Sequence, residues 1–147
     1  MLIGSYQGIL SSKRRVALPS KFRKELGQKP IVAKWYEDCL VIVSKTNWNV
    51  LLQRLTGEAA IITAPVRDTD RFILGSAYEL EPDDQGRVVI PESLASYASL
   101  KEEIIFLGLG DRVEVWDKQD WEKREGLIAD KAANLIEEIA KNEKEGR

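Results

Sequence analysis

One nine-residue segment occurs twice in this chain, and the duplication constrains the fold more than any other feature. Residues 11–19 read SSKRRVALP and residues 83–91 read DDQGRVVIP, at an offset of 72 residues. Farther along, the offset becomes 73 and pairs Trp48 with Trp121. One residue inserted near position 100 accounts for the change. The chain is therefore expected to contain two copies of one structural unit.

Each copy predicts a hairpin, a short helix, a second hairpin and a helix. In the first copy, the predicted elements are strands over 2–10, 15–18, 31–35 and 39–44, a short helix from Pro19 to Gly27, and a helix capped by Thr46 or Asn47. In the second copy, they are strands over 77–81, 87–90, 103–107 and 112–116, a short helix from Pro91, and a final helix capped by Asp117 or Asp120. Gly108 to Gly110 is predicted to connect the last two strands.

A unit of this size buries too little apolar surface to be stable alone. We therefore expect one α+β, mainly β domain, in which the two copies close a shared barrel and helices pack outside it. Its core is expected around Val16, Leu18, Val88 and Ile90. The predicted boundaries are 1–56 for the first repeat, 57–70 for a connector, 71–140 for the second repeat with its long helix, and 141–147 for a polar tail that frays.

Positive charge is concentrated in one part of an acidic chain. The formal net charge is −2, yet residues 11–30 contain seven cations and one anion, Glu25. These cations are Lys13, Arg14, Arg15, Lys21, Arg23, Lys24 and Lys29. A charge run is often only a solvated face. Three consecutive cations beside a tight turn instead favour an anionic partner, and a focused basic patch can bind nucleic acid.

The composition argues against several other classes of protein. Without histidine there is no Ser-His-Asp or Cys-His machinery and no imidazole metal ligand. The single cysteine, Cys39, reads as a small strand residue in a reducing cytoplasm. Asp83 and Asp84 are adjacent, so in an extended segment they face opposite sides and do not share a catalytic site. We expect no enzyme activity, cofactor, small-molecule substrate, signal peptide or membrane span.

The doubled segment resembles the MraZ family of the swapped-hairpin AbrB-like superfamily. The resemblance rests on the Asp-x-x-Gly-Arg signature at Asp83 to Arg87, followed by an apolar strand, a proline and a short helix, with Trp116 and Trp121 farther on. Membership implies a tandem swapped-hairpin barrel and a DNA-binding transcriptional regulator of the division and cell-wall gene cluster. It also implies a homo-oligomeric ring on repeated promoter-proximal sites of double-stranded DNA, in the cytoplasm at the nucleoid.

The first copy departs from the family signature in a way that adds positive charge. Ser11 stands at the aspartate position and Arg14 at the glycine position. Because an arginine at positive φ costs roughly 1 kcal/mol or more, a shift of turn type is expected. The resemblance places DNA contact on Lys13 and Arg15. The residues of this chain add Arg14 at the turn, with phosphates held by Lys21, Arg23 or Lys24.

The second copy is more acidic and is expected to be structural. Asp83, Gly86 and Arg87 are predicted to build a turn and a subunit interface, with Arg87 pairing with Asp83 or with a neighbouring subunit. Two other functions stay open. One is an antitoxin-like module that binds a protein partner through the apolar face from Trp121 to Ile139. The other is an enzyme that uses Asp83 and Asp84. The final helix can pack within its own subunit or against a neighbour.

Overall fold

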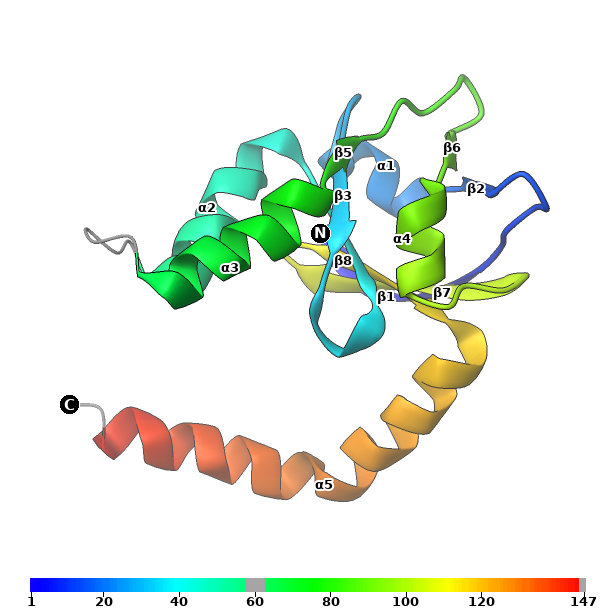
Figure 1. The fold of residues 1–147 in the computed structure, drawn as a ribbon. Coiled ribbons are helices and arrows are strands. Elements are labelled where there is room, and N and C mark those ends of the chain that lie inside the picture. Colours follow the sequence, from blue (N-terminus) through cyan, green and yellow to red (C-terminus); the bar gives the residue numbers. More distant parts are fainter. Residues whose placement is uncertain (58–62, 146–147) are drawn as a thin grey trace.

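The computed structural model describes residues 1–57 and 63–145. The first repeat contains β1 (Leu2–Ile9), β2 (Arg15–Ala17), α1 (Ser20–Leu26), β3 (Ile31–Lys34), the 3-10 turn η1 (Tyr36–Asp38), β4 (Leu40–Val43) and α2 (Lys45–Thr56). Next come α3 (Ala64–Ile73) and η2 (Leu74–Ser76). The second repeat contains β5 (Tyr78–Glu79), β6 (Arg87–Val89), α4 (Glu92–Tyr97), β7 (Glu103–Gly110), β8 (Val113–Asp117) and α5 (Lys118–Glu145). Figure 1 shows this arrangement.

The strands of the two repeats are interleaved. A six-stranded sheet has the order β1-β7-β8-β4-β3-β5, and a separate two-stranded sheet pairs β2 with β6. The β1–β7, β3–β5, β4–β8 and β2–β6 pairs, all antiparallel, join one repeat to the other. The expected closed barrel is not confirmed, because the strands form two separate sheets. The mixed α/β composition and the internal duplication are confirmed.

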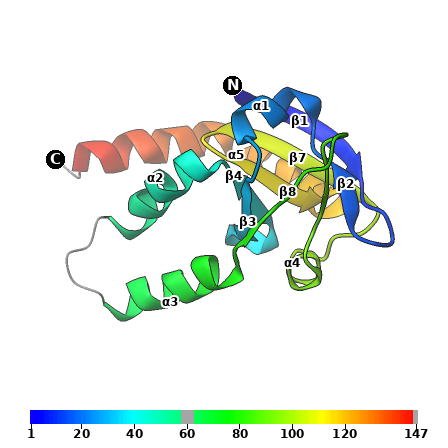
Figure 2. The same ribbon diagram turned by 90° about the horizontal axis from the view of Figure 1, so that it is seen from above.

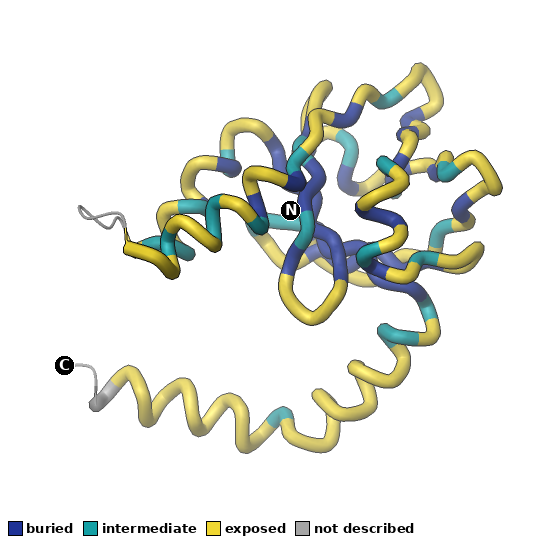
Figure 3. The backbone as a smooth tube through the Cα atoms, in the orientation of Figure 1, coloured by how far each residue is buried: buried dark blue, intermediate teal, exposed yellow. Residues whose placement is uncertain are grey.

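One core is shared by both repeats, as predicted. Val16, Leu18, Val88 and Ile90 lie in a single buried cluster. Phe22 of α1 and Leu94 of α4, at equivalent positions of the two repeats, join the same cluster and are fully buried. A second buried cluster contains Trp48, Leu51 and Trp116, with Leu52, Leu55 and Trp121 packed against it. Figure 3 shows the buried stretches gathered in the body of the molecule. Neither repeat therefore has a core of its own.

The boundaries of helix α2 and strand β7 differ from the prediction. Helix α2 begins at Lys45, and its cap is Ser44, whose Oγ accepts a hydrogen bond from the Asn47 amide at 3.2 Å; the prediction of a cap at Thr46 or Asn47 is wrong. Strand β7 continues through Gly108 to Gly110, where a connection was predicted. A Cβ on Gly108 would lie 2.5 Å from the backbone nitrogen of Ile3. Glycine therefore lets β1 approach β7 closely enough to extend the ladder.

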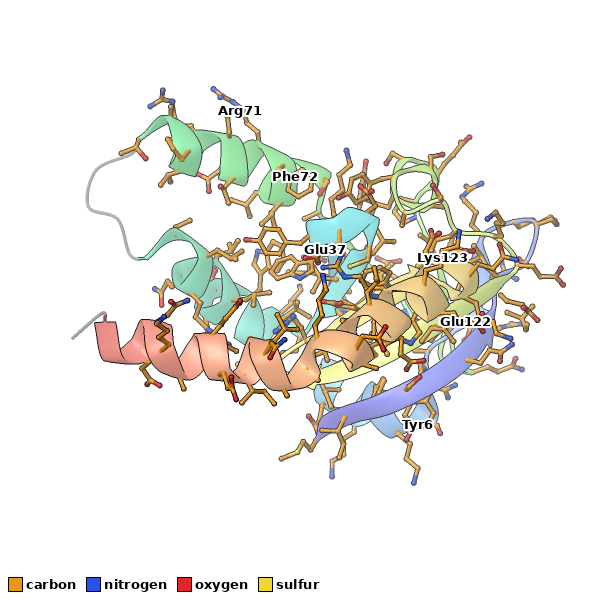
Figure 4. The ribbon with its side chains drawn as sticks, turned by 90° about the horizontal axis from the view of Figure 1, so that it is seen from below. Tyr6, Glu37, Arg71, Phe72, Glu122 and Lys123 are labelled. Atoms are coloured by element: carbon orange, nitrogen blue, oxygen red, sulfur yellow. The ribbon has the colours of Figure 1, made fainter. Side chains whose placement is uncertain are left out.

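The predicted connector 57–70 is partly helical. Its second part begins α3, with Pro65 in the first turn, where the missing amide proton of proline costs nothing. Phe72 of α3 packs against Tyr97 with ring centroids 5.8 Å apart, while Arg71 points away from the body (Figure 4). Residues 58–62 of this connector lie outside the described residues. The strand predicted over 77–81 is only Tyr78–Glu79.

Helix α5 is 28 residues long and leaves the body of the molecule (Figures 1 and 3). It includes Lys141 to Glu145, the first residues of the predicted polar tail. Its start is joined to the body through Trp121, which packs on Trp116, and Arg124, which pairs with Glu37 at 3.4 Å. Its apolar side chains are exposed rather than in a core: Leu127, Ile128, Leu135, Ile136 and Ile139. Among the described helices, α5 included, none has a stretch apolar and long enough for a membrane crossing.

Candidate nucleic-acid interface

The first turn, residues 11–15, is held by its serine. The Ser11 Oγ accepts hydrogen bonds from the amides of Lys13 at 3.3 Å and Arg15 at 3.1 Å. The Ser11 amide donates to the Arg15 carbonyl at 2.9 Å, and the Arg14 amide donates to the Ser11 carbonyl at 2.9 Å. A short hydroxyl side chain can close a turn in this way. Lys13 and Arg15 are consequently presented on an ordered tip.

The second turn, residues 83–87, has the same backbone. The Asp83 Oδ1 accepts from the amides of Gln85 and Arg87, both at 2.9 Å. Gly86 has φ 75°, and Arg14 at the equivalent position of the first turn has φ 60°. The expected change of turn type is therefore wrong: the first turn keeps its shape and places an arginine in the left-handed region. The hydrogen bonds of Ser11 hold the turn in that conformation.

The two turns differ in charge rather than in shape. In the second turn, the Arg87 Nε donates to the Asp83 Oδ2 at 2.8 Å, which confirms the predicted pairing with the turn aspartate. The backbone amide of Arg87 and this ion pair hold the pKa of Asp83 below its usual value. Ser11 provides no carboxylate in the first turn. Within the described part of the chain, neither Lys13 nor Arg15 forms an ion pair, and both side chains are exposed.

Arg14 and Arg23 each donate a hydrogen bond from the guanidinium group to a backbone carbonyl. The Arg14 Nε donates to the Ile90 carbonyl at 3.0 Å, and the Arg23 Nε donates to the Leu18 carbonyl at 3.0 Å. Leu18 and Ile90 occupy equivalent positions in the two repeats, each directly before a proline. Each arginine thus binds the carbonyl that follows one of the two short strands, β2 and β6.

The six predicted cations do not form one cluster around the first turn. Arg23 of α1 lies against the second turn, because a Cβ on Gly86 would lie 2.2 Å from its Nε. Lys21 and Lys24 are exposed on the same helix. The first turn lies instead beside α4 and its Glu92, across a groove of about 860 Å³. Figure 2 shows α1 and α4 on opposite sides of β2.

Sequence reasoning missed Ala95, which stands in α4 where α1 has Arg23. Comparing the two repeats at the offset of 72 shows this difference as well as the difference between Arg14 and Gly86.

A reactive cysteine and a metal site find little support in the structure. Cys39 is fully buried and its Sγ donates to the Tyr36 carbonyl at 3.2 Å, while burial raises the pKa of the thiol. No three acidic or cysteine side chains among the described residues are grouped as metal ligands.

Interleaved repeats, a shared core and two matching turns of different charge define a duplicated, pseudo-symmetric protein. The sequence profile of the family described as "MraZ protein, putative antitoxin-like" matches residues 1–72 and again residues 73–142. A "Transcriptional regulator MraZ" of Caldicellulosiruptor saccharolyticus is 39% identical over 142 residues, covering 95% of this chain and 99% of the relative. One of the same name from Acetivibrio thermocellus is 39% identical over 145 residues, covering 95% and 97%. This chain belongs to the MraZ family.

A solved structure, "The solution structure of PHS018 from Pyrococcus horikoshii", aligns with a TM-score of 0.33 and 13% identity. The alignment covers 78% of this chain and 88% of that one. At this level of similarity, it carries no argument about fold or function.

Proposed function

We propose that this chain is a transcriptional regulator that binds DNA through the first turn. The main support is the contrast between the two turns, which share one backbone conformation. The second turn contains the Asp83–Arg87 ion pair, whereas Lys13 and Arg15 of the first turn are unpaired among the described residues. Unpaired cations on an ordered tip suit phosphate contact and, for an arginine, bidentate contact with guanine. The relatives named transcriptional regulators support this function. The proposed location is the cytoplasm, at the nucleoid.

Few phosphate contacts are available to a single tip, so one copy should bind one site weakly. Several copies presented to evenly spaced repeats gain affinity through effective concentration. We therefore propose a homo-oligomeric ring on repeated promoter-proximal sites, in the division and cell-wall gene cluster that the resemblance implies. The exposed apolar residues of α5, among them Leu127 and Ile136, provide a surface for self-association. Lys21 and Lys24 add phosphate contacts at a distance from the tip.

The test is a mobility shift of the full chain on the DNA upstream of its own gene. The K13A/R15A variant is expected to lose specific binding, and the K131A/K141A variant of α5 removes the same charge elsewhere and should bind like the original. Circular dichroism establishes that both variants are folded. Unchanged binding by K13A/R15A at moderate salt would overturn the proposal. Changing the repeat spacing by half a helical turn should weaken binding, and equal affinity at every spacing would exclude a rigid multivalent reader.

A second candidate is an antitoxin-type module that binds a protein partner, favoured by the exposed apolar face of α5 and by the family description. Truncation after Gly126 separates the two functions. If the face joins copies of this chain, the truncated protein sediments as a smaller species. If the face binds a different protein, the truncated chain keeps its own oligomeric state and loses a stoichiometric second polypeptide.

A further inference from the structure

Equivalent backbone carbonyls of the two repeats each accept a hydrogen bond from an arginine of the first repeat, one in helix α1 and one in the first turn. In the pair β2–β6, the Leu18 amide donates to the Gly86 carbonyl at 2.9 Å, and the Ile90 amide donates to the Arg14 carbonyl at 2.8 Å. The Leu18 carbonyl is then bound by Arg23 from helix α1. The equivalent Ile90 carbonyl is bound by Arg14 from the turn. Both ends of the two-stranded sheet thus carry a charged donor, although the equivalent positions hold different residues.

An arginine in the helix and a side chain in the facing turn compete for the same space. A Cβ on Gly86 would lie 2.2 Å from the Nε and 2.3 Å from the Cζ of Arg23. A side chain in the facing turn would therefore displace the guanidinium of the helix arginine, and a glycine there leaves it in place. On the other side of the pseudo-two-fold axis, Arg14 fills the turn position and Ala95 is the small residue of the helix. The groove beside the first turn is lined by both Arg14 and Ala95.

We infer that Arg14 and Arg23 are positioning residues that fix the orientation of the two turns by capping the β2–β6 sheet. The capping arginine can belong either to the turn or to the facing helix. This sheet has only three residue pairs, and so short a ladder is marginal by itself. A charged donor makes a stronger hydrogen bond than a neutral one. Arg14 holds Ile90 by both its backbone carbonyl and its Nε, so the first turn has a fixed direction relative to the core.

Neighbouring cations of the first turn therefore have different roles. Lys13 and Arg15 are exposed and form no ion pair in the described chain, whereas Arg14 is half-buried with its Nε bound. The statement about DNA rests on the proposed function: Arg14 acts on DNA binding through the orientation of Lys13 and Arg15. The role of Arg14 and Arg23 at the ends of the β2–β6 sheet does not depend on DNA binding.

Moving the arginine from the turn to the helix tests the inference. R14G removes the guanidinium, and A95R alone leaves the place at Ile90 occupied by Arg14. R14G/A95R recreates the arrangement of Gly86 and Arg23, with room for the new side chain in the groove. We expect the double variant to have a higher urea midpoint than either single variant. R14G/A95K supplies the charge without the planar guanidinium and should show no recovery. A double variant no more stable than R14G overturns the inference.

DNA binding gives a readout that a purely structural role would not move. R14G is expected to weaken binding to the upstream DNA at least fivefold, and R14G/A95R to restore it with no cation at position 14. If R14G/A95R is as stable as the original yet stays weak, Arg14 itself contacts DNA and the positioning role is overturned. If the original chain does not bind that DNA specifically, the proposed function fails, while the urea midpoints still decide the role of the two arginines.

Discussion

The first and second turns have the same backbone conformation, but the side chains around them differ in charge. Ser11 and Asp83 accept equivalent amide hydrogen bonds, and Arg14 and Gly86 both adopt positive φ. The second turn neutralises its arginine with Asp83 and stands beside the cations of α1. The first turn has no acid of its own and stands beside Glu92 of α4. Duplication thus preserved a shape, and substitutions at a few positions gave the two copies different electrostatic potentials.

The core should not distinguish the repeats. F22A and L94A remove fully buried side chains at equivalent positions, with expected losses of about 3–5 and about 2–5 kcal/mol of unfolding free energy. Because both side chains lie in one cluster, each variant should unfold in a single transition in urea, followed by circular dichroism and tryptophan fluorescence. Two separated transitions would mean that the repeats are stable independently, against the shared core.

Gly86 should be less replaceable than an ordinary glycine at positive φ. G86A adds backbone strain and displaces the Arg23 guanidinium from the Leu18 carbonyl, for an expected loss of about 2–4 kcal/mol in urea unfolding. Gly57 has φ 64° and ψ 28°, in the left-handed region, and no atom within 4 Å of an added Cβ, so G57A is a control with strain alone, about 1 kcal/mol. Equal losses would show that the contact with Arg23 contributes nothing.

The charge difference should appear in the salt dependence of DNA binding. If Lys13 neutralises one phosphate, K13A lowers the slope of log K against log salt by about 0.9. Gln85 occupies the equivalent position of the second turn, so Q85A should leave the slope unchanged. Fluorescence anisotropy between low and moderate salt measures both. An unchanged slope for K13A would show that Lys13 neutralises no phosphate.

Acid should weaken only the second turn. The pKa of Asp83 is lower in the folded chain than its ordinary value of 3.8, so this carboxylate contributes stability above pH 3.8 and loses it as the pH falls through the folded pKa. D83S introduces the residue of the first turn and should reduce the dependence of unfolding free energy on pH below 4. The effect is small because Asp83 is exposed. A profile for D83S that parallels the original chain would contradict the linkage.

Much of the fold follows from local patterns. Val16 and Val88 alternate with exposed neighbours, and the continuous apolar run Leu40–Val43 becomes a central strand buried at every residue. The two short helices form where predicted, although each begins one residue after its proline, Pro19 or Pro91. The errors occur where tertiary contacts override local signals. Gly108 reads as a turn residue in sequence, yet it continues a strand because the backbone of β1 lies against it.

The candidate site was predicted only in part. The pairing of Arg87 with Asp83 follows from their spacing, and the cationic character of the first turn follows from Ser11 and Arg14. The run of cations between residues 11 and 30 also suggested one patch. The interleaved strands instead place α1 beside the second turn, so closeness in sequence does not give closeness in space.

By itself, the sequence determined the duplication, the shared core and the charge of each turn, because these depend on residue identity and short-range spacing. Only the tertiary structure decided that β2 pairs with β6 of the other repeat, which brings Arg14 to Ile90 and Arg23 to Gly86. The same structure left the apolar face of α5 exposed. The physical reason is that strand exchange joins segments about 70 residues apart, and local preference carries no information about such partners.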